Sequence, residues 1–117
     1  MVAEPERSEA LSVRKLVLET AKYNVLTAHS TREALEIFSL FPNINVAVLV
    51  RDEVIDCRLL AQSFKTATQT IPVVVLSPRI GDKCDGADHM LSSHEPEELV
   101  DLMRSLVGDP RQSNEKN

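Results

Sequence analysis

The sequence predicts an α/β fold, in which a doubly wound parallel sheet carries helices on both faces. Two continuous apolar runs, "INVAVLV" at 44–50 and "IPVVVL" at 71–76, are typical of parallel strands that helices cover on both sides. Segments with helical spacing of apolar residues stand between and around these runs, and such alternation implies right-handed βαβ crossovers. In sheets of this kind, function gathers beyond the carboxyl ends of the strands.

Four segments have helical spacing, and one further segment is a short strand candidate. In the second helical segment Ser30 is followed three residues later by Glu33, which is the spacing of a capping box. The last helix is expected to begin near Pro96 and to stop at Gly108. The helical segments are 8–21, 30–41, 57–65 and 96–107, the strand candidate is 23–28, and the side chains that 30–41 should place toward a core are Ala34, Leu35, Ile37, Phe38 and Phe41.

Length and charge narrow the class of protein. A chain of 117 residues is expected to form one domain, here 1–107, followed by a polar tail or linker stub at 108–117. The 13 basic and 18 acidic side chains give a net charge of -5, which argues against nucleic acid or an anionic membrane as the main partner. No signal peptide and no membrane-length apolar run is present, so we expect a cytoplasmic protein.

The two cysteines are Cys57 and Cys84. They are far apart in the sequence and match no metal-binding or redox spacing. Free thiols in a reducing compartment are therefore expected, with Cys57 acting as a small buried apolar side chain.

Several stretches occur in the order in which a known family has them. They are "AEP", "YNVLTAHSTREALEIF", "VAVLV", "IPVVVLSP", "GADHML" and "PEELVDLMRSL". From Ala3 to Val107 the sequence therefore resembles the receiver domain of two-component response regulators. The resemblance implies a flavodoxin-like sheet with strand order 2-1-3-4-5. It also implies an aspartate at the end of the third strand that accepts a phosphoryl group, helped by acidic residues that hold magnesium, a Ser or Thr, and a Lys.

Carrying that pattern over residue by residue gives a degenerate pocket. The acceptor position falls on Val50, and Asp52 stands two residues later. The acidic pair after the first strand falls on "AE", which leaves only Glu4. If the strand continued past Val50, Asp52 would share its face but lie about 6 to 7 Å further on.

The two remaining positions lie after the fourth and fifth strands. The Ser or Thr position matches Ser77, whereas the Lys position falls on Ser92 or Ser93. A carboxylate that attacks phosphorus needs a cation, a hydroxyl donor and an ammonium around the acyl phosphate. We therefore expect no phosphotransfer, no catalytic residue, no metal and no cofactor, and a protein that is not an enzyme.

Two further departures from the family concern whole elements. Only Met1 to Ala3 precede "EP", so the first strand is expected to be truncated, and either the chain is clipped or another segment fills the gap. From Ser77 to the fifth strand the chain is too short for a normal fourth helix. The segment after Ser77, the fifth strand and the last helix form the expected contact surface.

Three functions follow from these observations. The first is a pseudo-receiver that binds a signalling protein, or itself as a homodimer, without phosphorylation. The second is an active receiver in which Asp52, together with Glu4 or Glu53, accepts phosphate from a histidine kinase or a small phosphodonor. The third is a small-ligand or metal-binding module built on the loop 81–94. That loop contains Asp82, Cys84, Asp85, Asp88, His89 and His94, although their spacing fits neither a zinc site nor a calcium loop.

Overall fold

Five parallel strands form one sheet in the order β2-β1-β3-β4-β5. This computed structural model describes residues 1–4, 13–41, 43–52, 55–67, 71–79, 83–93 and 95–108. The strands are β1 (Val2–Ala3), β2 (Thr27–Ala28), β3 (Ala47–Val50), β4 (Val73–Ser77) and β5 (His89–Ser92). The strand order and the parallel pairing confirm the predicted doubly wound, flavodoxin-like sheet.

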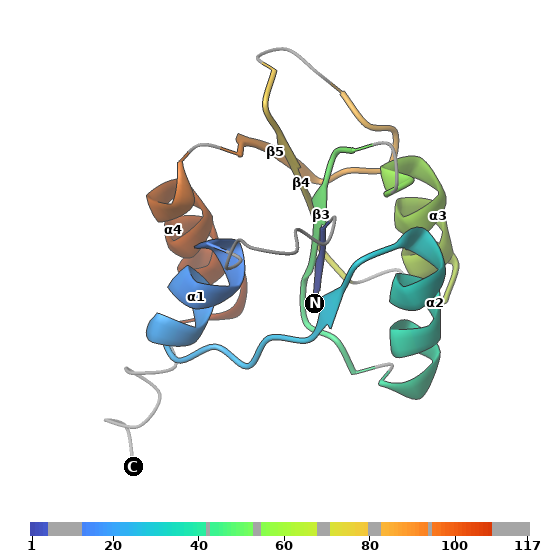
Figure 1. Ribbon diagram of the computed structural model, residues 1–117, viewed down its shortest axis with the longest axis horizontal. Helices are drawn as coiled ribbons and strands as arrows, with labels where there is room; N and C mark the ends of the chain where they lie inside the picture. The colour runs from blue at the N-terminus through green and yellow to red at the C-terminus, as the bar shows by residue number, and fades with distance from the viewer. Residues whose placement is uncertain are drawn as a thin grey trace.

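Helices cover both faces of this sheet. Figure 1 shows α1 and α4 together on one face and α2 and α3 together on the other. The central strands β3 and β4 are buried throughout because each face has its own apolar layer. The helices are α1 (Val13–Thr20), α2 (Thr31–Leu40), α3 (Cys57–Ala67) and α4 (Pro96–Val107).

The four predicted helices are present, and α3 continues to Ala67, two residues past its predicted end. Of the segment 8–21, residues 8–12 lie outside the described residues. The Ser30 hydroxyl accepts a hydrogen bond from the Glu33 N–H at 3.1 Å, as the capping-box spacing predicts. Phe41, in contrast, is 53% exposed rather than in the core. The reason is that α2 ends at Leu40, so Phe41 leaves the buried face of the helix.

The strand predicted at 23–28 is shorter in the structure. Only Thr27 and Ala28 form β2, because β1 offers just Val2 and Ala3 as partners. The same two residues of β1 pair with Val48 and Leu49 on the other side. The central strand is therefore short, as the truncated-strand expectation states. Between β4 and β5, none of the described residues, 78–79 and 83–88, is helical.

The prediction of free thiols is wrong. Cys57 and Cys84 form a disulfide, with their Cα atoms 6.5 Å apart. Sequence spacing missed this pair because 27 residues separate the two positions, and only the packing of the segment before β5 against the start of α3 brings them together. Cys57 is half-buried as one half of this bond, not a free apolar side chain.

Candidate functional site at the carboxyl ends of the strands

Four neighbouring strands end at the same edge of the sheet, and each brings one residue of the predicted pocket. The register pairs Ala3 with Leu49, so Glu4 follows beside Val50. At the next strands the register pairs Ser77 with Ser92. The structure therefore assembles the positions predicted from the four separate stretches, because parallel strands share one carboxyl edge.

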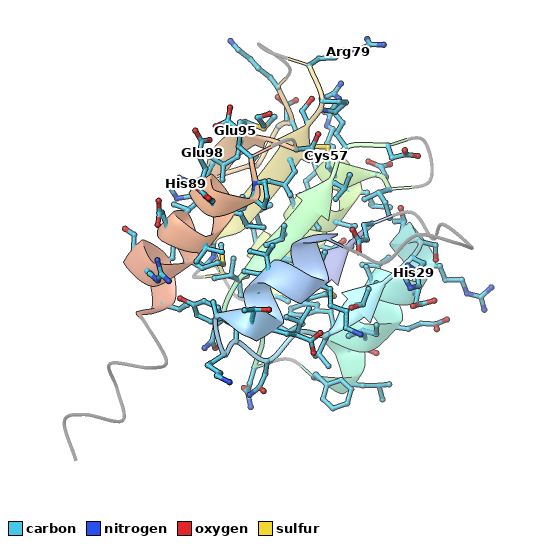
Figure 2. All side chains as sticks on the ribbon, turned by 60° about the vertical axis from the view of Figure 1, so that its left-hand side comes forward. His29, Cys57, Arg79, His89, Glu95 and Glu98 are labelled. Carbon is cyan, nitrogen blue, oxygen red and sulfur yellow. A yellow bond between two sulfur atoms is a disulfide. The ribbon has the colours of Figure 1, made fainter. Side chains whose placement is uncertain are left out.

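The central residues of this edge are buried. Val50, the last residue of β3, is 8% exposed, and Glu4 is 2% exposed. The main chain of Glu4 is fixed from β2: its N–H donates to the Ala28 carbonyl at 2.9 Å, and its own carbonyl lies 3.2 Å from His29 Nδ1. Figure 2 labels His29 on this side of the molecule. The position that the resemblance gives to the acceptor thus carries a buried valine.

Asp52 does not continue the strand. β3 ends at Val50, and Asp52 pairs with Ile55 in an isolated antiparallel bridge, in which the Ile55 N–H donates to the Asp52 carbonyl at 3.2 Å. β3 therefore does not include Asp52, and the strand step of about 6 to 7 Å that was assumed for it stays an expectation. Asp52 is exposed in this turn. Glu53, the other carboxylate of the active-receiver hypothesis, lies outside the described residues.

Ser77 takes part in local main-chain geometry. It is 3% exposed, and its hydroxyl oxygen accepts a hydrogen bond from the Arg79 N–H at 3.2 Å. Its carbonyl accepts from the Ser93 N–H at 3.0 Å, which ties the ends of β4 and β5 together. Ser93 itself is half-buried. A serine oxygen that accepts from the N–H two residues later forms a turn, so Ser77 has a local structural role.

Sequence reasoning gave no role to Arg51, which stands directly after Val50. Its N–H donates to the Leu76 carbonyl at 2.8 Å, and its guanidinium donates through Nη1 to the Lys83 carbonyl. A cation therefore does lie at the carboxyl end of β3, but it holds the main chain of the segment that follows β4. The sequence signal that could have indicated a role for Arg51 is its position, because it is a charged residue directly after a buried strand.

The chemical groups of the 83–93 segment are engaged with α3. Cys84 is bonded to Cys57, and Asp85 lies 3.8 Å from the Arg58 guanidinium. Asp88 forms an ion pair with Lys65 at 2.6 Å. Asp82 and His94 lie outside the described residues. Among the residues described, no three His, Cys, Asp or Glu side chains are grouped so that they could hold a metal ion.

Asp88 is the most perturbed carboxylate of this segment. Partial burial acts to raise its pKa, but hydrogen bonds from Lys65 and from the Val73 N–H outweigh that effect, and the positive charge of Lys65 adds to them. The pKa of Asp88 is therefore lowered from its ordinary value. The carboxylate is ionised and acts as an anchor between α3, β4 and the start of β5.

A pocket of about 620 Å³ lies at the opposite end of the sheet, where the strands begin. Met1, Val25, Ile44 and Met103 are among its lining residues. It also takes in four of the five large apolar side chains that are exposed in the described part of the chain, namely Leu26, Leu40, Phe41 and Val107. Sequence reasoning missed this pocket, and the short first strand was its only signal.

The fold matches that of known receiver domains. The crystal structure of a response regulator receiver domain protein from Clostridium thermocellum superposes with a TM-score of 0.77, at 22% sequence identity, over 95% of each chain. This similarity confirms the receiver-like fold that the sequence predicts. No protein-family model and no curated protein matches the sequence. In the described part of the chain, no helix combines the length and the hydrophobicity that a membrane span needs.

Proposed function

We propose that this chain is a receiver-like signalling module that binds a protein partner without being phosphorylated. In this proposal the partner is a signalling protein or a second copy of the chain, and the module acts in the cytoplasm. It is not an enzyme, and it needs neither magnesium nor another cofactor. Nucleic acid and membrane are not its partners.

One observation carries the proposal. Val50, to which the resemblance gives the acceptor position, ends β3 and is 8% exposed. A valine side chain has no nucleophile, so a phosphoryl group has no atom to bond to at this point. Ser92 and Ser93, which stand where the resemblance calls for lysine, offer no ammonium to stabilise an acyl phosphate.

The active-receiver hypothesis requires Asp52 to replace the acceptor. Asp52 is exposed in a turn beyond β3, whereas Glu4 is buried beside Val50. A phosphorylated Asp52 would therefore face water, which favours hydrolysis over a stable switch.

The third hypothesis, a ligand or metal module on residues 81–94, is less favoured because Cys84, Asp85 and Asp88 are already engaged with α3.

The first prediction follows directly. Incubation of the chain with magnesium and acetyl phosphate should leave its intact mass unchanged, because Val50, at the acceptor position that the resemblance implies, has no carboxylate. Mass spectrometry of the intact chain measures this, with a phosphorylatable receiver domain treated in parallel as the positive control. A mass increase of one phosphoryl group that disappears in Asp52→Asn would establish the active-receiver alternative instead.

The binding arm of the same experiment separates the partner from the chemistry. Affinity capture is carried out with the chain before and after acetyl phosphate treatment. A partner that is retained equally in both samples supports the proposal. Retention only after treatment would contradict it, because binding would then depend on phosphorylation.

A further inference from the structure

The Cys57–Cys84 disulfide joins two elements that the receiver chemistry does not explain. Cys57 is the first residue of α3, and Cys84 lies in the segment that leads into β5. We refer to residues 83–88 as the docked segment. Figure 2 labels Cys57, whose sulfur lies near the carboxyl ends of the strands. The bond therefore ties the segment after β4 to the neighbouring helix.

The far end of the docked segment has an anchor of its own. Asp88 Oδ2 accepts from Lys65 Nζ at 2.6 Å and from the Val73 N–H at 2.7 Å. The Asp88 N–H donates to the Val73 carbonyl at 2.8 Å, and β5 starts at the next residue. These contacts hold Asp88 whether or not the disulfide is present.

The near end depends mainly on the disulfide. The ion pair of Arg58 with Asp85 is 3.8 Å long, and its side chains are 67% and 78% exposed, so it contributes little. Gly86 has a φ of +91° and packs so closely on α3 that an added Cβ would lie 3.0 Å from the Cβ of Ala61. The Ala87 N–H closes the turn by donating to the Cys84 carbonyl at 3.1 Å. The Arg51 guanidinium also donates to the Lys83 carbonyl, but Arg51 follows β3 and is not part of α3. Among the described contacts, the disulfide is therefore the strong link between this end and α3.

The position of Cys57 favours exchange of the disulfide. The N–H groups at the start of a helix, together with the helix dipole, favour a thiolate over a thiol. The carboxylate of Asp56, which caps α3 by accepting from the Leu59 N–H at 3.0 Å, acts against it. A sulfur that is stable as a thiolate is a good leaving group in thiol–disulfide exchange. Both cysteines are half-buried, so each retains some access to solvent.

We infer that Cys57 and Cys84 form a reversible thiol–disulfide exchange site, whose opening by a dithiol reductant releases residues 83–87 from α3. A thiolate of the reductant attacks Sγ of Cys84, the S–S bond breaks, and Cys57 leaves as a thiolate. The second thiol of the reductant then displaces Cys84 and closes the reductant's own disulfide. In the balance, the protein gains two electrons and two protons, and the dithiol loses the same. The inference stands on the disulfide and its contacts, and it holds whether or not a partner binds.

Hydrogen exchange of the full chain tests the inference, with dithiothreitol as the probe. On reduction, the Ala87 amide should exchange at least about tenfold faster, because its turn opens locally. The Asp88 amide is the internal control, since the Val73 carbonyl still accepts its hydrogen bond, and it should change little. Alkylation followed by mass spectrometry counts the thiols: the oxidised chain should take up no label and the reduced chain should take up two.

A matched variant keeps the test decisive. Cys84→Ser removes the bond without a reductant, and its Ala87 amide should exchange as fast as in the reduced wild-type chain. Its far-ultraviolet circular dichroism reports whether the fold persists, and if it does not, the reduced wild-type chain carries the comparison. Two results would overturn the inference: two free thiols in the chain purified in air, or a reduced chain whose Ala87 amide exchanges at the oxidised rate.

Discussion

Asp88 joins three parts of the molecule through one carboxylate. Its Oδ2 accepts from the Lys65 ammonium and from the Val73 N–H, at 2.6 and 2.7 Å. Lys65 also donates to the Ile71 carbonyl at 2.8 Å, so the end of α3 is connected to the entrance of β4 as well. Both side chains of the ion pair are partly exposed, 31% for Lys65 and 39% for Asp88, so solvent screens it and its net contribution is modest.

We expect Asp88→Asn to lower the free energy of unfolding at pH 7 by about 0.5 to 1 kcal/mol. The pKa of Asp88 is lowered in the folded chain, so its stabilising effect is complete above the ordinary aspartate pKa. The effect is lost as the pH falls through the lower, folded value. The gap between the wild-type chain and Asp88→Asn should therefore close on acidification.

Urea unfolding of both chains at neutral pH and below pH 4, roughly the ordinary aspartate pKa, measures that gap. Asp101→Asn is the matched control, because Asp101 forms an exposed pair with Arg104 at 3.4 Å and is 76% exposed. Its effect should be smaller at neutral pH. An Asp88→Asn difference of the same size at both pH values would contradict the role given to the ionised carboxylate.

The docked segment and α3 fit together through a close approach of main chain and helix. Gly86 lies against Ala61 with a φ of +91°, and Gly108, after α4, has a φ of +85° with nothing within 4 Å of an added Cβ. Both glycines therefore adopt the left-handed backbone conformation, but only Gly86 also has a crowded neighbour. Substitutions at these two glycines therefore separate the cost of a positive φ from the cost of close packing.

Gly108→Ala should lower the free energy of unfolding by about 1 kcal/mol, because alanine is strained at a positive φ. Gly86→Ala should cost about 2 to 4 kcal/mol, since the added methyl group must also displace Ala61 or the segment itself. Thermal or urea unfolding of the oxidised chains gives both values. If both variants lose the same free energy of unfolding, the docked segment can move to accommodate the methyl group at no cost. The close packing of Gly86 on Ala61 would then not contribute to stability.

The sequence predicted the elements whose signals are local. Ser30 and Glu33 fixed the start of α2, Pro96 and Gly108 bounded α4, and continuous apolar runs marked β3 and β4. Their order gave the sheet and the alignment of four strand ends at one edge. The length predicted for β2 failed because it depends on a distant partner. Only two residues of β1, at the start of the sequence, pair with β2.

The disulfide and the pocket were beyond sequence reasoning for the same reason. Cys57 and Cys84 meet only because Asp88 and Gly86 dock the segment before β5 on α3. The pocket exists only because residues 23–26 and 43–46 flank a first strand that pairs over two residues. The disulfide and the pocket both depend on how separate elements lie next to each other. The periodicity of a single segment does not encode that arrangement.

Taken as a whole, the molecule has two different ends. At the carboxyl edge of the sheet, Val50 and Ser77 are buried and Arg51 holds the docked segment, so this end is closed. At the amino end, a pocket of about 620 Å³ is bordered by exposed apolar side chains. At this end Met1 is bonded to β3, because its carbonyl accepts a hydrogen bond from the Val48 N–H at 2.8 Å.

This asymmetry leads to the last prediction, which concerns self-association. Apolar side chains that gather at an exposed pocket mark contact surfaces. We expect the weight-average sedimentation coefficient of the wild-type chain to rise with concentration. Phe41→Asp should remove the rise, because Phe41 is 53% exposed at the pocket and a carboxylate there would be buried on association. Leu59→Asp is the matched control, since Leu59 is 44% exposed on α3, outside the pocket lining. A coefficient that is constant for the wild-type chain, or a rise that Phe41→Asp leaves intact, would exclude the pocket as the contact between copies.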